Sequence, residues 1–340
     1  MKRPALLAVD GGGSKIDAAL LRRDGSVLGA RRVAADDYEQ TGDDAFFASI
    51  GRAVEAASAD AGFDPRGGPV AGLGMFCLAG ADLPSDDRRI DRGLARRGWV
   101  EAQVLRNDTF AVLRAGTDRT WGVGIVCGFG TNCSGVAPDG RVFRLPAIGS
   151  VSGDWGGGHE LGGSALWHAI RAGDGRGRRT AFQRSVPAHF RMRTARQVME
   201  ALYNGRMDED RLAELAPTVF HEAADGDPIA MELVARQADE IATMAGAAIR
   251  RLGLRDMDPD VVLGGGIFHN EWAPFFSRIE TGLRAVAPGA RMVRLTAPPV
   301  VGAVMLGLDV LGATGAARRR ARAGLTRARL STHTRAGKER

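Results

Sequence analysis

The strongest constraint on the fold is one pattern of strands and glycine turns that occurs twice, well separated in the chain. In each copy an apolar run is followed by a glycine-rich turn, a second apolar run and an Asp-Gly pair. Apolar runs bounded by turn residues are typical of buried strands, and Asp-Gly favours a tight hairpin turn. Each copy, at residues 6–28 and 123–143, therefore predicts three strands joined by two turns.

The glycine turns of the two copies have the composition of phosphate-binding loops. Glycine has no Cβ, so main-chain N–H groups can approach phosphate oxygens closely, and hydroxyl side chains add further donors. Two such hairpins predict a site that clasps a polyphosphate. The predicted phosphate-binding residues are Gly11, Gly12, Gly13, Ser14 and Lys15 in the first turn and Gly128, Gly130 and Thr131 in the second.

Strands and helices alternate between and after the two copies, which predicts an α/β fold with largely parallel sheets. Apolar residues at helical spacing predict a helix over residues 43–61. Strands are expected over residues 70–78 and 102–105, and Ser85 is expected to cap a helix over residues 86–97.

The ends of the predicted strands carry the residues that suit a ligand. Ligands of parallel sheets gather at the carboxyl ends of the strands, where the pattern places Asp10, Asp108 and Gly128. A third glycine turn follows a buried strand at residues 261–263, and its lack of side chains suits the flat face of a nucleotide. This turn consists of Gly264, Gly265 and Gly266.

Residues 149–163 are so rich in glycine that an irregular loop is expected. It is either a ligand loop or a mobile one, and its place beside the second hairpin favours a ligand loop. Asp154, Trp155 and Glu160 are its candidate ligand-binding residues. A long amphipathic helix is expected after this region, over residues 227–253.

Length and charge narrow the class of protein. A chain of 340 residues is expected to form two domains. The formal net charge is +6, but residues 318–340 hold eight Arg and one Lys against one Glu, so the rest of the chain is near −2. Such a basic tail is typical of a solvated, disordered extension, and no nucleic-acid binding is predicted from it.

The apolar runs are shorter than a secretory or membrane-spanning segment requires, so no membrane association is expected. Cys77, Cys127 and Cys133 have none of the spacings of a zinc site or a disulfide framework. These features favour a cytoplasmic protein.

Together, in this order, the motifs resemble those of the BadF/BadG/BcrA/BcrD ATPase family, which includes N-acetylglucosamine kinases and lies within the sugar kinase, actin and heat-shock chaperone ATPase superfamily. The resemblance covers residues 5 to about 313. The residues that carry it are Asp10-Gly11-Gly12-Gly13-Ser14-Lys15, Leu78-Ala79-Gly80-Ala81-Asp82, Asn107-Asp108, Gly128-Phe129-Gly130-Thr131-Asn132-Cys133, Asp154-Trp155-Gly156 and Gly264-Gly265-Gly266.

The resemblance implies two actin-like (ribonuclease H-like) domains, with mixed sheets flanked by helices, that close a cleft around Mg-ATP and an acceptor. The implied domains are residues 1–116, completed by a helix near residues 299–316, and residues 117–298, with a disordered tail at 317–340. Asp10 would hold Mg²⁺ largely through water. The two hairpins would hold the phosphates of ATP, and the third glycine turn would meet the adenosine.

Asp108 is the implied catalytic residue. Asn107-Asp108-Thr109 resembles the triplet at which hexose kinases place the aspartate that accepts the proton of the attacking hydroxyl. The residues alone leave a second reading open, in which Asp108 caps the helix that follows.

The implied acceptor is a sugar, N-acetylglucosamine or a related amino sugar. The implied acceptor contacts are Asp37, Asn107, Asn132, Asp154, Trp155 and Glu160. N-acetylglucosamine kinases usually read Gly-Asp-Glu-Gly-Ser where this chain has residues 160–164, Glu-Leu-Gly-Gly-Ser. Asp154 and Glu160 are therefore the alternatives for the missing sugar-binding aspartate.

Two other classes stay open. One is an ATPase that activates a dehydratase or reductase through an iron–sulfur cluster, as some family members do. The other is a protein that binds nucleotide or sugar without turnover. The resemblance also makes a homodimer a possible assembly.

Overall fold

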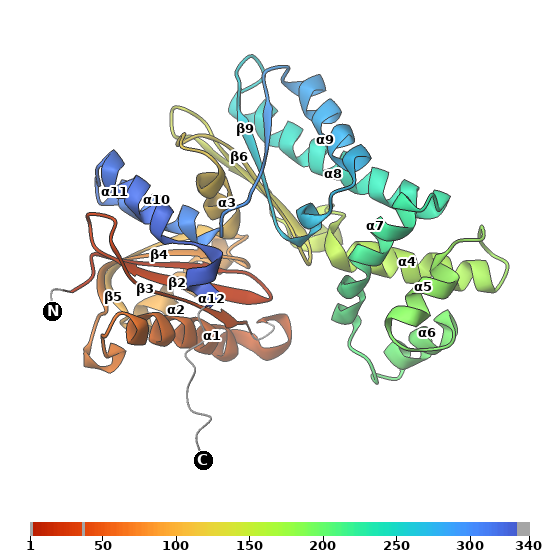
Figure 1. Ribbon diagram of the computed structural model, residues 1–340, viewed down its shortest axis with the longest axis horizontal. Coiled ribbons are helices and arrows are strands. Elements are labelled where there is room, and N and C mark those ends of the chain that lie inside the picture. Colours follow the sequence, from red (N-terminus) through yellow and green to blue (C-terminus); the bar gives the residue numbers. More distant parts are fainter. Residues whose placement is uncertain (1–2, 36–37, 332–340) are drawn as a thin grey trace. The chain divides into compact units, whose positions relative to one another are not determined.

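The computed structural model describes residues 3–35 and 38–331, and the chain divides into two compact units (Figure 1). Unit 1 comprises Met1–Thr120 and Leu295–Arg340, so the C-terminal part of the chain returns to the N-terminal unit. Unit 2 comprises Trp121–Arg294.

Unit 1 is built on a five-stranded mixed sheet with the strand order β3-β2-β1-β4-β5. β1, β2 and β3 form an antiparallel meander, and β4 and β5 run parallel to β1. The strands are β1 (Leu6–Gly11), β2 (Lys15–Leu21), β3 (Val27–Ala34), β4 (Ala71–Leu78) and β5 (Val100–Asn107).

Unit 2 repeats this architecture with the order β10-β9-β6-β7-β8. Its first three strands again form an antiparallel meander, and β9 and β10 again run parallel to β6. The predicted double strand–turn pattern is therefore confirmed, and each copy forms the start of its own sheet. The strands are β6 (Gly122–Cys127), β7 (Thr131–Val136), β8 (Val142–Arg144), β9 (Asp260–Gly264) and β10 (Arg291–Arg294).

Helices cover both faces of the unit 1 sheet because alternate strand residues are apolar on both sides. Leu7 and Val9 of β1 pack in the core under α1 and α2, whereas Leu6 and Ala8 pack under α3, α10 and α11. The helices are α1 (Tyr38–Asp60), α2 (Pro84–Arg97), α3 (Asp108–Gly116), α10 (Val300–Val310), α11 (Gly315–Gly324) and α12 (Arg327–Ser331).

The helices of unit 2 share one large core with its sheet. The predicted long helix is confirmed as α8: the Asp227 carboxylate accepts the N–H groups of Ile229 and Ala230 at 3.0 and 2.9 Å, and Gly253 ends the helix at φ 72°. The helices are α4 (Gly157–Gly173), α5 (Phe182–His189), α6 (Ala195–Tyr203), α7 (Ala216–Ala224), α8 (Pro228–Leu252) and α9 (Ala273–Val286).

Two local predictions are wrong. The glycine-rich region is irregular only in its first half, because α4 begins at Gly157 and continues through the remaining glycines. Ser85 does not cap α2, since the helix begins at Pro84 and the backbone N–H of Leu83 donates to the Asp86 carboxylate at 3.1 Å.

The expectation of a disordered tail from residue 317 also differs from the structure. Residues 315–331 form α11 and α12, and Ala321, Leu325 and Leu330 are buried against unit 1. Arg318 pairs with Asp309 at 2.9 Å, so part of the basic charge is neutralised by acids of the same unit. Residues 332–340 lie outside the described residues.

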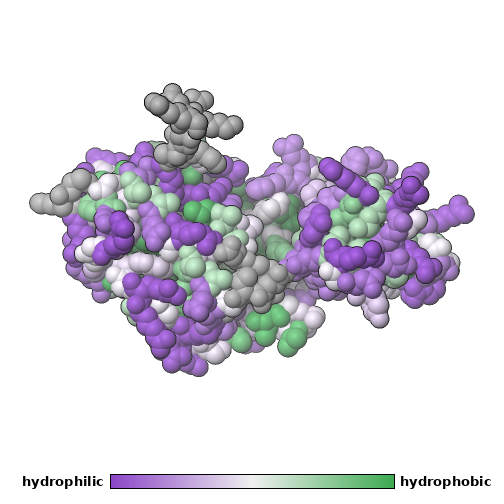
Figure 2. Space-filling model, turned by 90° about the horizontal axis from the view of Figure 1, so that it is seen from below, coloured by the Kyte–Doolittle hydropathy of each residue, from purple (hydrophilic) through white to green (hydrophobic). Residues whose placement is uncertain are grey.

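Polar side chains cover most of the face of the molecule seen in Figure 2, with small apolar areas between them. Within residues 3–35 and 38–331, none of the helices combines the length and apolar character that a bilayer crossing requires.

Candidate active site

A row of five side chains crosses the unit 1 sheet near the carboxyl end of β1. Asp10 lies directly opposite Asp17 of β2 on one side and Cys77 of β4 on the other. The row continues to Arg32 of β3 and Arg106 of β5. Directly paired residues point to the same face of a sheet, so the row shares the face covered by α3 and α10. Of these five residues, only Asp10 is a predicted site residue.

Within the row, an ion pair with Arg32 balances the charge of Asp17, whereas the surroundings of Asp10 raise its pKa. Asp17 is fully buried, and its carboxylate accepts hydrogen bonds from Arg32 Nε and Nη2 at 2.6 and 2.7 Å. Burial raises the pKa of Asp10 well above its usual range, and Asp17 and Asp108 raise it further, whereas Lys15 and Arg32 lower it. A cation beside Asp10 would relieve this cost.

The turn between β1 and β2 is the predicted first phosphate turn. The Gly12 N–H donates to the Lys15 carbonyl at 3.1 Å and closes the hairpin. A Cβ on Gly11 would lie 2.7 Å from Leu78 Cδ2, so close packing against Leu78 accounts for a glycine at this position. By contrast, no atom lies within 4 Å of the Cβ position of Gly13. The exposed residues of the turn are Gly13 and Ser14.

Asp108, the predicted base, is the first residue of α3 and is partly exposed. Burial, followed by the negative charge of Asp82, raises its pKa to about 7. Its charge also raises the pKa of Asp10, so the two carboxyl groups lie close enough to interact. A carboxylate with this pKa is suited to accept a proton at neutral pH.

Asn107, predicted as an acceptor contact, has a structural role instead. Its Oδ1 accepts the Thr109 N–H and hydroxyl at 3.0 and 2.6 Å, and its Nδ2 donates to Asp82 Oδ1 at 2.9 Å and the Ala81 carbonyl at 3.3 Å. These bonds use both of its donors and both acceptor positions, and the side chain is buried. The predicted contact Asp37 lies outside the described residues.

The second predicted phosphate turn, between β6 and β7, packs on the start of α4. The Gly128 N–H donates to the Gly130 carbonyl at 2.9 Å. The carbonyls of Gly128 and Phe129 accept the N–H groups of Gly158 and His159 at 2.8 and 3.0 Å. The turn is therefore held from its carbonyl side by the first turn of a helix.

The third glycine turn lies beside the second. Gly264 ends β9, which is the parallel neighbour of β6. Gly265 has φ 108°, and a Cβ there would lie 2.3 Å from the Cys127 carbonyl oxygen. The N–H of Gly266 lies 4.0 Å from the Cβ position of Gly128. Unit 2 thus brings together three glycine segments that are far apart in the sequence.

The polar residues after the second turn make short-range bonds. Asn132 Oδ1 accepts the Cys133 N–H at 2.7 Å. The Thr131 hydroxyl lies 3.4 Å from the Val126 carbonyl and 3.9 Å from the sulfur of Met244. Both side chains are partly exposed, so their assignment to ligands stays a prediction.

The acceptor candidates before and within α4 differ in their surroundings. The carboxylate of Asp154 accepts a hydrogen bond from the Ser152 hydroxyl. The guanidinium of Arg236 lies 4.0 Å from the centroid of the Trp155 ring. Glu160 lies in the first turn of α4 and is partly exposed. Of the two alternative carboxylates, Glu160 is the one on a rigid helix.

Sequence reasoning missed three polar residues that shape the site. Asp82 lies in the motif at residues 78–82 but has no predicted role, and Asp17 and Gln237 are not among the predicted site residues. Asp17 interrupts an apolar strand, and Gln237 lies four residues from both Leu233 and Ile241 on the buried face of α8. A polar residue at a core position was the available signal for both.

The Asp10 carboxyl group fits what a magnesium ion requires of a protein. No group of three His, Cys, Asp or Glu suited to a metal occurs in the described part of the chain. Mg²⁺ needs only one or two carboxylates because water and substrate phosphates supply its other ligands. Asp10 meets that need, whereas Asp17 is already bound to Arg32.

The three cysteines lack the setting of iron–sulfur ligands. Cys77, Cys127 and Cys133 are all fully buried. Burial raises the pKa of Cys127 to about 12 and that of Cys77 and Cys133 above the usual range. Ligating thiols must lose their proton, so these environments oppose cluster binding.

Comparison with known proteins gives consistent results. Residues 7–307 match the model of the BadF/BadG/BcrA/BcrD ATPase family. The chain is 23% identical to the N-acetyl-D-glucosamine kinase of Dictyostelium discoideum over 322 residues, covering 91% of this chain and 99% of the relative. It is 22% identical to the N-acetylmuramic acid/N-acetylglucosamine kinase of Clostridium acetobutylicum over 272 residues, which cover 78% of this chain and 86% of the relative.

A solved structure confirms the predicted fold class. A proposed N-acetylglucosamine kinase from Chromobacterium violaceum has a TM-score of 0.69 and 23% identity, covering 90% of this chain and 99% of that one. The chain therefore has the fold expected from the motifs, with mixed sheets flanked by helices in each unit.

Proposed function

The chain belongs to the BadF/BadG/BcrA/BcrD ATPase family, and on this premise we propose that it transfers the γ-phosphate of ATP to a hydroxyl group of a sugar. The observation that carries the proposal is Asp108, a partly exposed carboxyl group. The pKa of Asp108 is raised to about 7, and its charge in turn raises the pKa of Asp10. The names of both curated relatives support a sugar as the acceptor.

We place the acceptor among N-acetylglucosamine and related amino sugars, as those names indicate. Glu160 and Asp154 are the carboxylates assigned to it, together with the partly exposed Trp155, one side of whose ring is covered by the guanidinium of Arg236. Asn132 adds an amide. Asn107 is removed from the acceptor contacts because its hydrogen bonds are used within unit 1.

In the proposed reaction, Asp108 accepts the proton of the acceptor hydroxyl as that oxygen attacks the γ-phosphorus. The new P–O bond forms, the bond to the leaving ADP oxygen breaks, and ADP carries away the electron pair of that bond. A positioned base contributes about 10²- to 10⁴-fold in rate. Its pKa near neutrality keeps a useful fraction of Asp108 both charged and basic.

The nucleotide would be bound by main-chain groups. Gly13, Ser14 and the second turn at residues 128–131 are assigned to the phosphates, and the third turn at 264–266 to the adenosine. Asp10 would hold Mg²⁺ in part through water, and the ion would supply charge stabilisation at the phosphates. Both ATP and magnesium are plentiful in the cytoplasm, where we place the activity.

The test is ATP consumption with a panel of N-acetylated sugars, free amino sugars and hexoses. The product is expected to gain the mass of one phosphate group, and the Asp108→Asn protein is expected to lose turnover while still binding ADP. ATP hydrolysis without transfer to any sugar, or no ADP binding by the wild type, would overturn the proposal.

A further inference from the structure

Gln237 of α8 is a buried polar residue whose two amide atoms differ in their hydrogen bonding. Its side chain is completely buried, and its Oε1 accepts the backbone N–H of Gly157 at 2.7 Å. Its Nε2 makes no hydrogen bond to any residue of the described chain. A buried amide that is only half satisfied costs stability, so the one hydrogen bond that it makes, to Gly157, is expected to be important for this contact.

The chain makes room for this amide at the start of α4. Gly156 has φ 128°, and a Cβ there would lie 2.5 Å from Nε2 and 2.8 Å from Oε1 of Gln237. A side chain at position 156 would displace the amide. Gly156 and Gln237 therefore form one packed contact between α8 and the segment that enters α4.

Gln237 binds the start of α4, and the start of α4 in turn binds the second phosphate turn. The Gly157 N–H is bound to Gln237, and the next two N–H groups of α4, from Gly158 and His159, donate to the carbonyls of Gly128 and Phe129 at 2.8 and 3.0 Å. These first donors of α4 are thus used within the protein. The end of this helix fixes the turn from behind.

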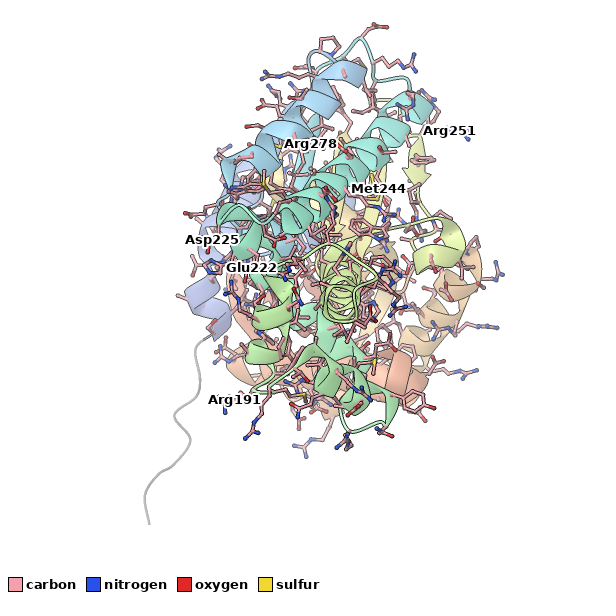
Figure 3. All side chains as sticks on the ribbon, turned by 90° about the vertical axis from the view of Figure 1, so that its right-hand side faces the viewer. Arg191, Glu222, Asp225, Met244, Arg251 and Arg278 are labelled. Atoms are coloured by element: carbon pink, nitrogen blue, oxygen red, sulfur yellow. The ribbon has the colours of Figure 1, made fainter. Side chains whose placement is uncertain are left out.

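Two further contacts run from α8 to the same region. Arg236, the neighbour of Gln237, covers the Trp155 ring at 4.0 Å. Met244, seven residues after Gln237 and labelled on α8 in Figure 3, lies 3.9 Å from the Thr131 hydroxyl. Residues at this spacing share one face of a helix, so one face of α8 contacts both the turn and the start of α4.

We propose that Gln237 is a positioning residue for nucleotide binding: by holding Gly157, it keeps the start of α4 in place and thereby fixes the phosphate turn at residues 128–131. This inference rests on the proposed function, since it assigns the turn to the phosphates of ATP. Gln237 itself touches no phosphate in this scheme.

The test compares three variants of the full-length protein. Gln237→Met keeps the length of the side chain and removes the acceptor. Gln237→Glu keeps an acceptor oxygen for Gly157 and breaks no other hydrogen bond, because Nε2 has none within the described residues. Burial favours the uncharged, protonated form of the new carboxyl group, so this variant is compared at a pH at which it is protonated. Ile241→Val, one turn further along the buried face of α8, is the matched control for loosened packing.

ADP affinity is measured by calorimetry, and amide hydrogen exchange is followed at residues 128–131 and 156–160. Gln237→Met is expected to weaken ADP binding about 5- to 10-fold and to raise the KM for ATP similarly, with kcat changed less than about 2-fold. Exchange should accelerate in both segments. Gln237→Glu should keep the exchange protection of residues 156–160.

The inference is overturned if Gln237→Met binds ADP as Ile241→Val does, or if both segments stay protected in it. It is also overturned if Gln237→Glu, with its carboxyl group protonated, loses protection as fully as Gln237→Met. Failure of the wild type to bind ADP would instead refute the proposed function, so the two failures are distinguishable.

Discussion

Asn107 closes the first turn of α3 by accepting both the N–H and the hydroxyl of Thr109, at 3.0 and 2.6 Å. The sequence alone left this capping role open to Asp108. Asn107 is the N-cap residue, and the carboxyl group of Asp108 also accepts hydrogen bonds from the backbone N–H groups of Thr109 and Asp108, which lower its pKa. The net pKa of Asp108 is nevertheless raised to about 7 by burial and by Asp82, which suits the role of base proposed for it.

The first prediction concerns the loss of the base. Asp108→Asn is expected to lower kcat by about 10²- to 10⁴-fold, because the amide cannot accept the hydroxyl proton. The Kd of ADP should stay the same. Asp118→Asn, which alters a carboxylate that is 99% exposed in the same unit, is the control and should keep full activity. A fully active Asp108→Asn protein would exclude Asp108 as the base.

The second prediction concerns pH. The base acts as a carboxylate, so kcat should fall about tenfold per pH unit below pH 7 and level off above it. The profile is measured at saturating ATP and sugar over the range in which the protein stays folded. A rate that is flat from pH 5 to 8 would contradict the assignment.

The third prediction concerns stability. The folded-state pKa of Asp108 lies above the unfolded value, so the folded protein holds this proton between about pH 4 and 7 and its stability falls as pH rises through that range. Above pH 7 the wild type carries the full cost of a shielded carboxylate. Asp108→Asn should then raise the free energy of unfolding by about 1 to 3 kcal/mol at pH 8. Denaturant titrations should show this gain shrinking toward pH 4; a constant difference would be evidence against the shift.

The fourth prediction concerns the ion pair beside Asp10. Arg32→Gln leaves Asp17 buried without its bidentate partner and should lower the free energy of unfolding by about 2 to 4 kcal/mol. Adding Asp17→Asn should restore part of the loss, because the unpaired charge is removed. If the double variant were as unstable as the sum of the single variants, charge pairing would not explain the effect.

The fifth prediction tests whether the C-terminal helices are folded onto unit 1. Ala321 of α11 is fully buried and Ala323 is exposed. Ala321→Asp places an unpaired charge in the core and should cost about 3 kcal/mol or more, whereas Ala323→Asp should stay within about 0.5 kcal/mol of the wild type. Equal thermal unfolding of the two variants would mean that α11 contributes no core.

Local sequence patterns predicted the repeated hairpins and α8, because their apolar periods and turn residues agree with the tertiary packing. The helices at residues 317–331 were not predicted, because the many arginines there indicate a solvated segment. Its apolar residues Ala321, Leu325 and Leu330 are seen to belong to the core only from their tertiary contacts. Asn107 was assigned to the acceptor for a similar reason. Its partners Asp82 and Ala81 are distant in sequence, and a hydrogen-bond network between loops leaves no periodic pattern.

Because the two sheets have the same strand order, the residues near the ends of β1 and β6 can be compared directly. Where the first copy carries Asp10 before its glycine turn, the second carries Cys127, whose thiol stays uncharged because its pKa is raised to about 12. One scaffold thus carries a carboxyl group at this position in one copy and a thiol in the other. Cys127→Asp would give both copies a carboxyl group, and on the proposed function this change is expected to weaken ADP binding.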